Sequence, residues 1–210
     1  MANIRRTAGR FSGSMISRKM AFSSLVSAFA IAAFATESQA ANWTGCHGAV
    51  AAGFTTVTTA PVAFGADGTQ IGVAAGCDYQ VDRFVLGAFA GYDWKTFDVG
   101  ASEIDATTLS FGARAGMLLN PDTLAYGLLA YTNSEVDDLD GDFDGLAFGG
   151  GLETVVHRGR GSFLTLKGEA RRIDHDTGVD DLDATETTVT AGLAYHFGGG
   201  ASIADGVPLK

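Results

Sequence analysis

Proline is scarce in this chain: 3 of its 210 residues are Pro, whereas 29 are Gly and 14 are Phe. This composition excludes a Pro-rich disordered chain and a collagen-like repeat, so the chain should fold. Long apolar runs are lacking too. The longest one, residues 20–34, is shorter than the about 20 residues that a helix needs to span a bilayer. We therefore expect no inner-membrane helix.

Basic residues are also few, and five of the 14 stand before that apolar run: Arg5, Arg6, Arg10, Arg18 and Lys19. Small residues follow the run at Ser38-Gln39-Ala40. This order is typical of a secretory signal peptide. We predict that residues 1–40 are a cleaved signal peptide and that the mature chain begins at Ala41.

The deficit of basic charge becomes larger once residues 1–40 are removed. The rest of the chain carries 9 basic and 23 acidic residues, a net charge of −14. Nucleic acid and anionic membrane surfaces are therefore poor partners. The acidic residues concentrate in residues 135–144 and 174–186. Both clusters lie between alternating segments, which predicts solvated loops at one end of the fold.

Apolar and polar residues alternate in eight segments. In residues 109–117 every second residue is apolar, while Arg114 lies on the opposite face, and the alternation resumes after Asn120-Pro121-Asp122. This pattern predicts β-strands of roughly ten residues and, at 120–122, a tight turn. The segments are residues 46–54, 71–79, 84–95, 109–117, 124–130, 146–153, 164–171 and 187–197.

Eight such strands match the smallest outer-membrane barrels, whose strands cross the bilayer in about 9–11 residues. Connections after the second, fourth and sixth segments are short, and the others are longer and mostly acidic, as periplasmic turns and external loops would be. A soluble barrel of the lipocalin kind is the alternative. We predict an all-β, eight-stranded antiparallel up-and-down transmembrane β-barrel over residues 41–197, with a tail at 198–210.

The two faces of the segments favour lipid over water outside the barrel. The more polar face carries charges of both signs: Asp78, Asp93, Arg114, Glu153, Lys167, Glu169 and Arg171. The apolar face carries aromatic residues near segment ends, as the girdles of membrane barrels do: Trp43, Phe54, Tyr79, Phe84, Tyr92, Trp94, Tyr126, Tyr195 and Phe197. In the central hairpin, the residues expected to face lipid are Leu109, Phe111, Met117, Leu124 and Tyr126, and those expected in the lumen are Ser110 and Arg114.

Several motifs, in this order and spacing, resemble the small outer-membrane β-barrel family of Gram-negative bacteria, the porin-like or opacity-like surface antigens. They are Trp43-Thr44-Gly45, Gly76-Cys77-Asp78-Tyr79-Gln80, Gly149-Gly150-Gly151-Leu152-Glu153, Lys167-Gly168-Glu169-Ala170-Arg171 and Tyr195-His196-Phe197. The chain departs from the family pattern at Cys46-His47, at Cys77 and in the residues after Phe197. The resemblance implies insertion by the outer-membrane assembly machinery, contact with outer-membrane lipid and lipopolysaccharide, and exposure of the acidic loops to a host or environmental ligand.

Cys46 and Cys77 are opposite each other if the first two segments form a hairpin centred on Pro61-Val62. An exported protein reaches an oxidising compartment, so a disulfide between them is one hypothesis. Two reduced thiols facing lipid are the other. Cys46 and His47 are not expected to share a metal ion, because neighbours on a strand point to opposite faces.

The inward charges predict a structural network in the lumen, formed by Arg114, Glu153, Lys167, Glu169 and Arg171. The interior of an eight-stranded barrel is just wide enough for its own side chains, so these residues should plug it. A small diffusion channel is the alternative. For Arg114, both Glu153 and Glu169 have the right face to be its partner.

No catalytic centre, cofactor or metal site is predicted. Residues 138–145 imitate the start of a calcium loop, but Gly151 stands where the closing carboxylate belongs. Outer-membrane proteases use Asp-Asp and Asp-His pairs, which Asp137-Asp138 and Asp174-His175 imitate, yet those barrels are larger. A barrel lipase needs a Ser beside a His, and no His here has a Ser within two residues. Haem capture through His175 is a further alternative. We predict a non-enzymatic surface protein of the outer membrane that contributes to envelope integrity and surface interaction.

Overall fold

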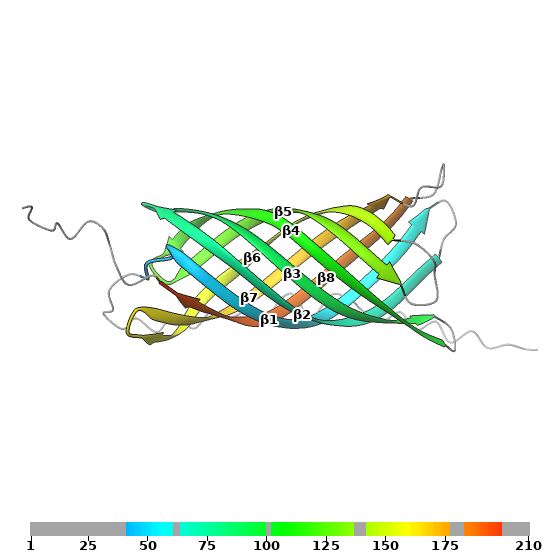
Figure 1. Cartoon of the computed structure of the whole chain (residues 1–210), viewed down its shortest axis with the longest axis horizontal. Helices are drawn as coiled ribbons and strands as arrows, with labels where there is room; N and C mark the ends of the chain where they lie inside the picture. Colours follow the sequence, from blue (N-terminus) through cyan, green and yellow to red (C-terminus); the bar gives the residue numbers. More distant parts are fainter. Residues whose placement is uncertain (1–40, 61–63, 100–101, 137–141, 177–182, 199–210) are drawn as a thin grey trace, which may run out of the picture. The chain divides into compact units, whose positions relative to one another are not determined.

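The computed structural model describes residues 41–60, 64–99, 102–136, 142–176 and 183–198, which form one closed antiparallel barrel (Figure 1). The strands are β1 (Gly45–Ala60), β2 (Phe64–Val81), β3 (Phe84–Val99), β4 (Ser102–Asn120), β5 (Thr123–Val136), β6 (Asp142–Gly159), β7 (Ser162–Asp176) and β8 (Asp183–Phe197). Within the described residues, no helix is long and apolar enough to cross a membrane. The predicted fold class is confirmed, while the predicted signal peptide and the tail beyond Gly198 lie outside the described residues.

Each strand pairs with its neighbours in the sequence, and β8 pairs with β1 to close the ring. The closing register runs from Cys46 opposite Phe197 to Ala60 opposite Asp183. A closed barrel has no strand at a sheet edge, so each strand is paired on both sides over most of its length. This architecture follows from the alternation of two unlike faces along all eight segments.

The strands contain 14 to 19 residues, so they are longer than the roughly ten residues predicted. Most of the added length lies toward the end of the barrel opposite the tight turns. There β1 ends at Ala60 and β2 begins at Phe64, while β3 ends at Val99 and β4 begins at Ser102. The prediction of longer connections at these two places is therefore wrong. Threonine and acidic residues continue the strands because outward positions beyond the apolar band can meet water.

The same extension corrects the assignment of the acidic clusters to loops. Residues 135–136, 142–144, 174–176 and 183–186 belong to β5, β6, β7 and β8, respectively. Residues 137–141 and 177–182, which also belong to these clusters, lie outside the described residues. The short turns were predicted correctly: two residues separate β2 from β3, β4 from β5, and β6 from β7. We call this end of the barrel, at the left of Figure 1, the turn end, and the other the loop end.

The outer surface carries an apolar band. On β3 it extends from Phe84, 60% exposed, to Trp94, 45% exposed, and outward-facing Thr96 and Asp98 follow it. Eleven residues at about 3.3 Å each, tilted by about 45°, span about 25 Å, the height of the lipid-facing band of outer-membrane barrels. On β4 the band covers Leu109 to Leu119. Most of the aromatic residues predicted for the girdle do face outward. Among them, Tyr92 packs against Trp94 with ring centroids 4.8 Å apart.

The face assigned to β5 is wrong. Leu124 and Tyr126 were expected to face lipid, but they are 0% and 7% exposed and point into the lumen. The register explains the difference, because Leu128 of β5 pairs with Arg114 of β4, and residues directly opposite each other share a face. Even-numbered residues therefore face inward on both strands. Leu129, 60% exposed, and Tyr131, 48% exposed, face outward instead.

Candidate functional site in the barrel lumen

Ionisable side chains in the lumen form three successive groups between the turn end and the loop end. The turn-end group consists of His47, Asp78, Arg114, Glu153 and His196. The middle group consists of Asp93, Tyr126, Lys167, Glu169 and Arg171. The loop-end group consists of Lys95, His175 and Glu186. Because these residues come from all eight strands, the closed barrel is what brings them together.

Arg114 is the centre of the turn-end group. Its Nε and Nη2 donate to Oδ1 and Oδ2 of Asp78 at 2.8 and 2.5 Å, and its Nη1 donates to Oε2 of Glu153 at 2.9 Å. The guanidinium is the side chain suited to this geometry, because its planar fork matches a carboxylate bidentately. All three residues are less than a tenth exposed. Arg114 thus ties β2, β4 and β6 together through the lumen.

A glycine makes room for this contact. Asp78 of β2 and Arg114 of β4 both pair with Gly87 of β3, so the ion pair crosses the strand between them. A Cβ atom at position 87 would lie 2.0 Å from Oδ1 of Asp78. Real Cβ contacts are never that short, so the site requires glycine at this place.

Two histidines complete the turn-end group. Nε2 of His196 lies 2.5 Å from Oε1 of Glu153, which also accepts a hydrogen bond from Thr165 at 2.7 Å. The ring of His196 stacks on Phe163 at 4.5 Å and lies edge-on to Trp43 at 5.2 Å. The ring of His47 lies beside that of His196, and the centroids of these two rings are 5.0 Å apart. Both imidazoles are thus enclosed within the barrel.

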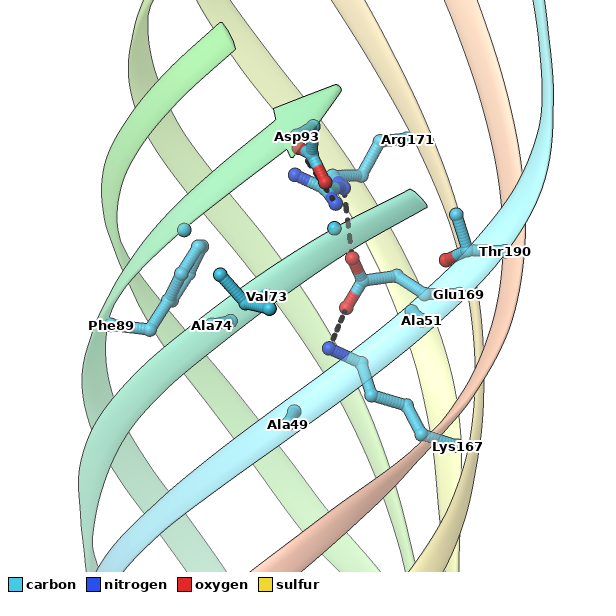
Figure 2. A pocket seen from close by; sticks show the side chains of 12 residues that line it. Ala49, Ala51, Val73, Ala74, Phe89, Asp93, Lys167, Glu169, Arg171 and Thr190 are labelled. Carbon is cyan, nitrogen blue, oxygen red and sulfur yellow. Dashed lines mark ion pairs between the residues drawn. The ribbon is translucent and has the colours of Figure 1, made fainter. Parts of the chain in front are cut away.

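Glu169 is the centre of the middle group (Figure 2). Its Oε2 accepts the hydroxyl of Tyr126 at 2.5 Å and lies 2.9 Å from Lys167 Nζ, while its Oε1 lies 2.8 Å from Arg171 Nε. Arg171 also reaches Asp93 at 3.6 Å. The guanidinium of Arg114 lies 5.3 Å from the centroid of the Tyr126 ring, within cation–π distance, and so connects this group with the turn-end group.

A small cavity adjoins the middle group. Its volume is about 30 Å³, and small residues of β1, β2 and β3 form the wall that faces the charges, among them Ala49, Ala51 and Ala74 (Figure 2). Since one water needs about 10–15 Å³ by this measure, the cavity has room for about two waters. A sugar or haem does not fit there.

Glu186 accepts most of the contacts in the loop-end group. Its Oε1 lies 2.5 Å from Lys95 Nζ and accepts a hydrogen bond from Thr55 at 3.0 Å, and its Oε2 lies 3.3 Å from Nε2 of His175. The sequence assigned Glu186 to a solvated loop, and that assignment is wrong, since Glu186 is 3% exposed. It lies on β8 at an inward position, one of several even-numbered polar residues there.

Buried apolar side chains form clusters on both sides of the charged groups. Toward the turn end, buried residues pack together: Ala41, Trp43, Val85, Leu118, Leu124, Tyr126, Leu128 and Phe163. Toward the loop end, Ala66, Phe97 and Ala106 pack with Val57 and Val136. Trp43 was expected in the outer girdle, and this expectation is wrong, because it is 1% exposed and lies in the first of these clusters. It precedes β1, so strand alternation could not place it.

The structure brings together the five residues predicted for the lumen, but in two groups. Arg114 and Glu153 are in direct contact, as are Lys167, Glu169 and Arg171. Of the two partners considered for Arg114, Glu153 makes the contact. Sequence reasoning missed Asp78 as the second partner, and it missed His47 and His196. The alternation on β1, β2 and β8 does predict that these three side chains point inward. That they meet in one group depends on how the barrel closes.

Cys46 and Cys77 are opposite each other on β1 and β2, and a disulfide joins them. Their side chains lie outside the lumen, toward the turn end, whereas His47 points inward. The disulfide therefore fastens the hairpin next to the turn-end group without contacting it.

The side chains proposed for protease chemistry do not form a pair. Adjacent on β7, Asp174 faces outward and accepts from Arg172 Nε at 2.8 Å, whereas His175 faces inward toward Glu186. Neighbouring strand residues point to opposite faces, so these two cannot activate the same water molecule. Asp137 and Asp138 lie outside the described residues.

Residues 21–197 match the family model described as outer membrane protein beta-barrel domain. The chain belongs to this family. Its location is accordingly the outer membrane. In bacterial barrels of this kind the short turns face the periplasm. None of the curated proteins is similar enough in sequence to match the chain.

Several solved structures match the chain at low sequence identity, and the first named here is similar in fold. Neisserial surface protein A (NspA), from Neisseria, has 15% sequence identity and a TM-score of 0.55, and the match covers 73% of this chain and 98% of that one. The attachment invasion locus protein Ail of Yersinia pestis has 15% identity and a TM-score of 0.41 over 72% and 99% of the two chains. OprG of Pseudomonas aeruginosa has 13% identity and a TM-score of 0.43 over 75% and 98%.

Proposed function

We propose that this protein is a non-conducting, non-enzymatic barrel of the outer membrane that contributes to envelope integrity and presents an acidic surface to the environment. The observation that supports the proposal is the arrangement of the buried side chains in the lumen. Three groups of charged side chains occupy it, and apolar clusters lie toward both ends. An ion that crossed the barrel would have to displace both kinds of barrier.

Charge pairing supports a structural role for these groups. Among the described residues, the middle group holds two carboxylates and two cations, and the loop-end group pairs Lys95 with Glu186. Buried charges are stable when they are paired and hydrogen-bonded, and removing one partner is strongly destabilising. The lumen therefore resembles a cross-linked core more than the wall of an aqueous pore.

The surface role rests on acidic residues at the loop end. Above the apolar band, outward positions carry many carboxylates, including Asp98 on β3, Glu103 and Asp105 on β4, and Asp144 on β6. Above the apolar band these carboxylates would lie beside the phosphates of lipopolysaccharide. Two negatively charged groups of this kind can contact each other only through bridging divalent cations, and a partner from outside would have to be positively charged. Nucleic acid is not an expected partner of such a surface.

Liposome swelling tests the first part of the proposal. Vesicles that contain the folded barrel should swell in isosmotic solutions of small sugars no faster than protein-free vesicles. Swelling that rises with the amount of barrel would favour the diffusion-channel alternative. For the second part, cells that lack the protein should become more sensitive to detergent, and a chain expressed in trans should restore resistance. Unchanged sensitivity would argue against a contribution to envelope integrity.

A further inference from the structure

Three potential metal ligands meet near the turn end of the lumen. His47 of β1, Asp78 of β2 and His196 of β8 each offer one ligand atom, and these atoms lie within 4.8 Å of one another. All three side chains are at least nine-tenths buried, at 5%, 6% and 3% exposed. The strands are consecutive in the closed ring, so the site exists only after β8 has paired with β1.

One ligand atom has no hydrogen bond. Nδ1 of His47 lies 3.2 Å from Oδ2 of Asp78, yet it is buried and makes no hydrogen bond with any group. Neighbouring ligand atoms around a tetrahedral zinc ion are about 3.3 Å apart and do not point at each other, because both point at the metal. The spacing of these two atoms fits two ligands of one cation.

The net charge of the turn-end group also favours a bound cation. Asp78 and Glu153 contribute two negative charges to the turn-end group and Arg114 one positive charge, so the group is left with one negative charge when both imidazoles are neutral. Among the described residues of the lumen, the other two groups balance. An unbalanced buried charge is costly, so the turn-end group attracts a cation.

Residues around the three ligands resemble an outer coordination sphere. Arg114 holds both oxygens of Asp78, and each carboxylate oxygen keeps a lone pair for a second contact. Glu153 contacts Nε2 of His196 at 2.5 Å. Ligating imidazoles commonly give their other ring N–H to a carboxylate, which fixes the ring and makes it a better ligand.

We propose that His47, Asp78 and His196 bind a divalent transition-metal ion of the zinc class at the periplasmic end of the lumen. Two imidazole nitrogens and one carboxylate suit zinc, whereas calcium and magnesium prefer oxygen ligands alone. Arg114 keeps its place on Asp78 and opposes the ion by its charge, so a moderate affinity is expected. The rival occupant is a single proton held by the imidazoles. The sequence predicted no metal site because its three ligands are far apart in the chain.

The test is a zinc titration of the full barrel, refolded in detergent and freed of metal with a chelator, in competition with a chromophoric zinc indicator. The expected result is one zinc per barrel, bound less well below about pH 6, where imidazoles take up protons. His47→Gln and His196→Gln should each abolish stoichiometric binding. Glu153→Gln should weaken it about 10–100-fold through loss of the outer partner. His157→Gln is the matched control, because His157 is exposed at the end of β6.

A second measurement does not depend on the folding of variants. X-ray absorption of the zinc-loaded wild-type barrel should show a shell of nitrogen and oxygen ligands that includes two imidazoles. Absence of stoichiometric binding to the wild-type barrel would overturn the proposal. So would binding that survives in both histidine variants, which would place the ion at the acidic exterior. A barrel whose thermal transition shifts with pH but not with zinc would assign the site to a proton.

Discussion

Arg114 of β4 contacts Asp78 of β2 across β3, where both residues pair with Gly87. Because Gly87 has no side chain, the guanidinium Nε and Nη2 reach the two carboxylate oxygens of Asp78 at 2.8 and 2.5 Å. The glycine is therefore as much a part of this ion pair as its two charged partners. Such an arrangement is readable only when three neighbouring strands are in register.

Gly87→Ala should disrupt this ion pair without removing a charge. The new Cβ would lie 2.0 Å from Oδ1 of Asp78, so the carboxylate must move away from Arg114. We expect a loss of about 2 kcal/mol or more in the free energy of unfolding, as for other disturbed buried ion pairs. Urea unfolding in detergent micelles measures it. Gly91→Ala is the control, since its Cβ would meet atoms no nearer than 3.6 Å; an equal loss in both variants would contradict the account.

Arg114→Ala should be more harmful, because it leaves Asp78 and Glu153 buried without their common cation. The expected loss is about 3–5 kcal/mol, and the gel shift between folded and heated barrel should occur at a lower temperature. Arg172→Ala serves as the comparison, because Arg172 lies on the outer surface with a side chain 52% exposed. If both variants keep the wild-type transition, Arg114 does not hold the lumen together.

Lys95 and Glu186 allow a double-mutant cycle at the loop end. Lys95→Met leaves a buried carboxylate whose Oε1 was 2.5 Å from the ammonium group, so it should cost about 3–5 kcal/mol. The double variant Lys95→Met with Glu186→Gln removes both charges and should be less harmful than the single one. Thermal unfolding of the four proteins gives the coupling energy. Additive losses would show that the two side chains act independently.

Labelling of thiols tests the link between Cys46 and Cys77. The folded barrel, denatured without reductant, should react with no maleimide, and two thiols should react after reduction. Because 31 residues separate the two cysteines, loss of the link should lower the free energy of unfolding by about 2–4 kcal/mol. Two freely labelled thiols in the untreated protein would refute the disulfide, and the matched variant Cys46→Ser with Cys77→Ser gives the unlinked reference.

The sequence allowed a correct prediction of the number of strands, the tight turns and the faces of β1 to β4 and β6 to β8, because one face of each is clearly more polar. It failed on β5, where Leu124 and Tyr126 on one face are matched by Leu129 and Tyr131 on the other. Periodicity cannot choose the inward face when both faces of a strand are apolar. The tight turn at 120–122 places Leu128 opposite Arg114, and because paired residues share a face, this would have assigned the even-numbered residues of β5 to the lumen.

The contacts between side chains in the lumen could be predicted only in part, because they depend on how the strands are arranged around the barrel. The strand pattern identifies which charges point inward, but it left Glu153 and Glu169 both open as the partner of Arg114. Asp78, His47 and His196 needed the stagger of the strands and the closure of β8 on β1, which no local pattern contains. Glu186 was missed because an acidic stretch at the end of a strand has the same composition as a solvated loop.

Conductance in planar lipid bilayers tests the central claim, the closed lumen, most directly. The folded wild-type barrel, inserted at known amount, should give no stable single-channel steps in 1 M KCl, because in the proposed account charged groups and apolar clusters block the path of an ion. A variant that removes large side chains from both clusters, Trp43→Ala with Phe97→Ala, should conduct more if those clusters are barriers. Regular open-channel steps in the wild-type protein would contradict the account.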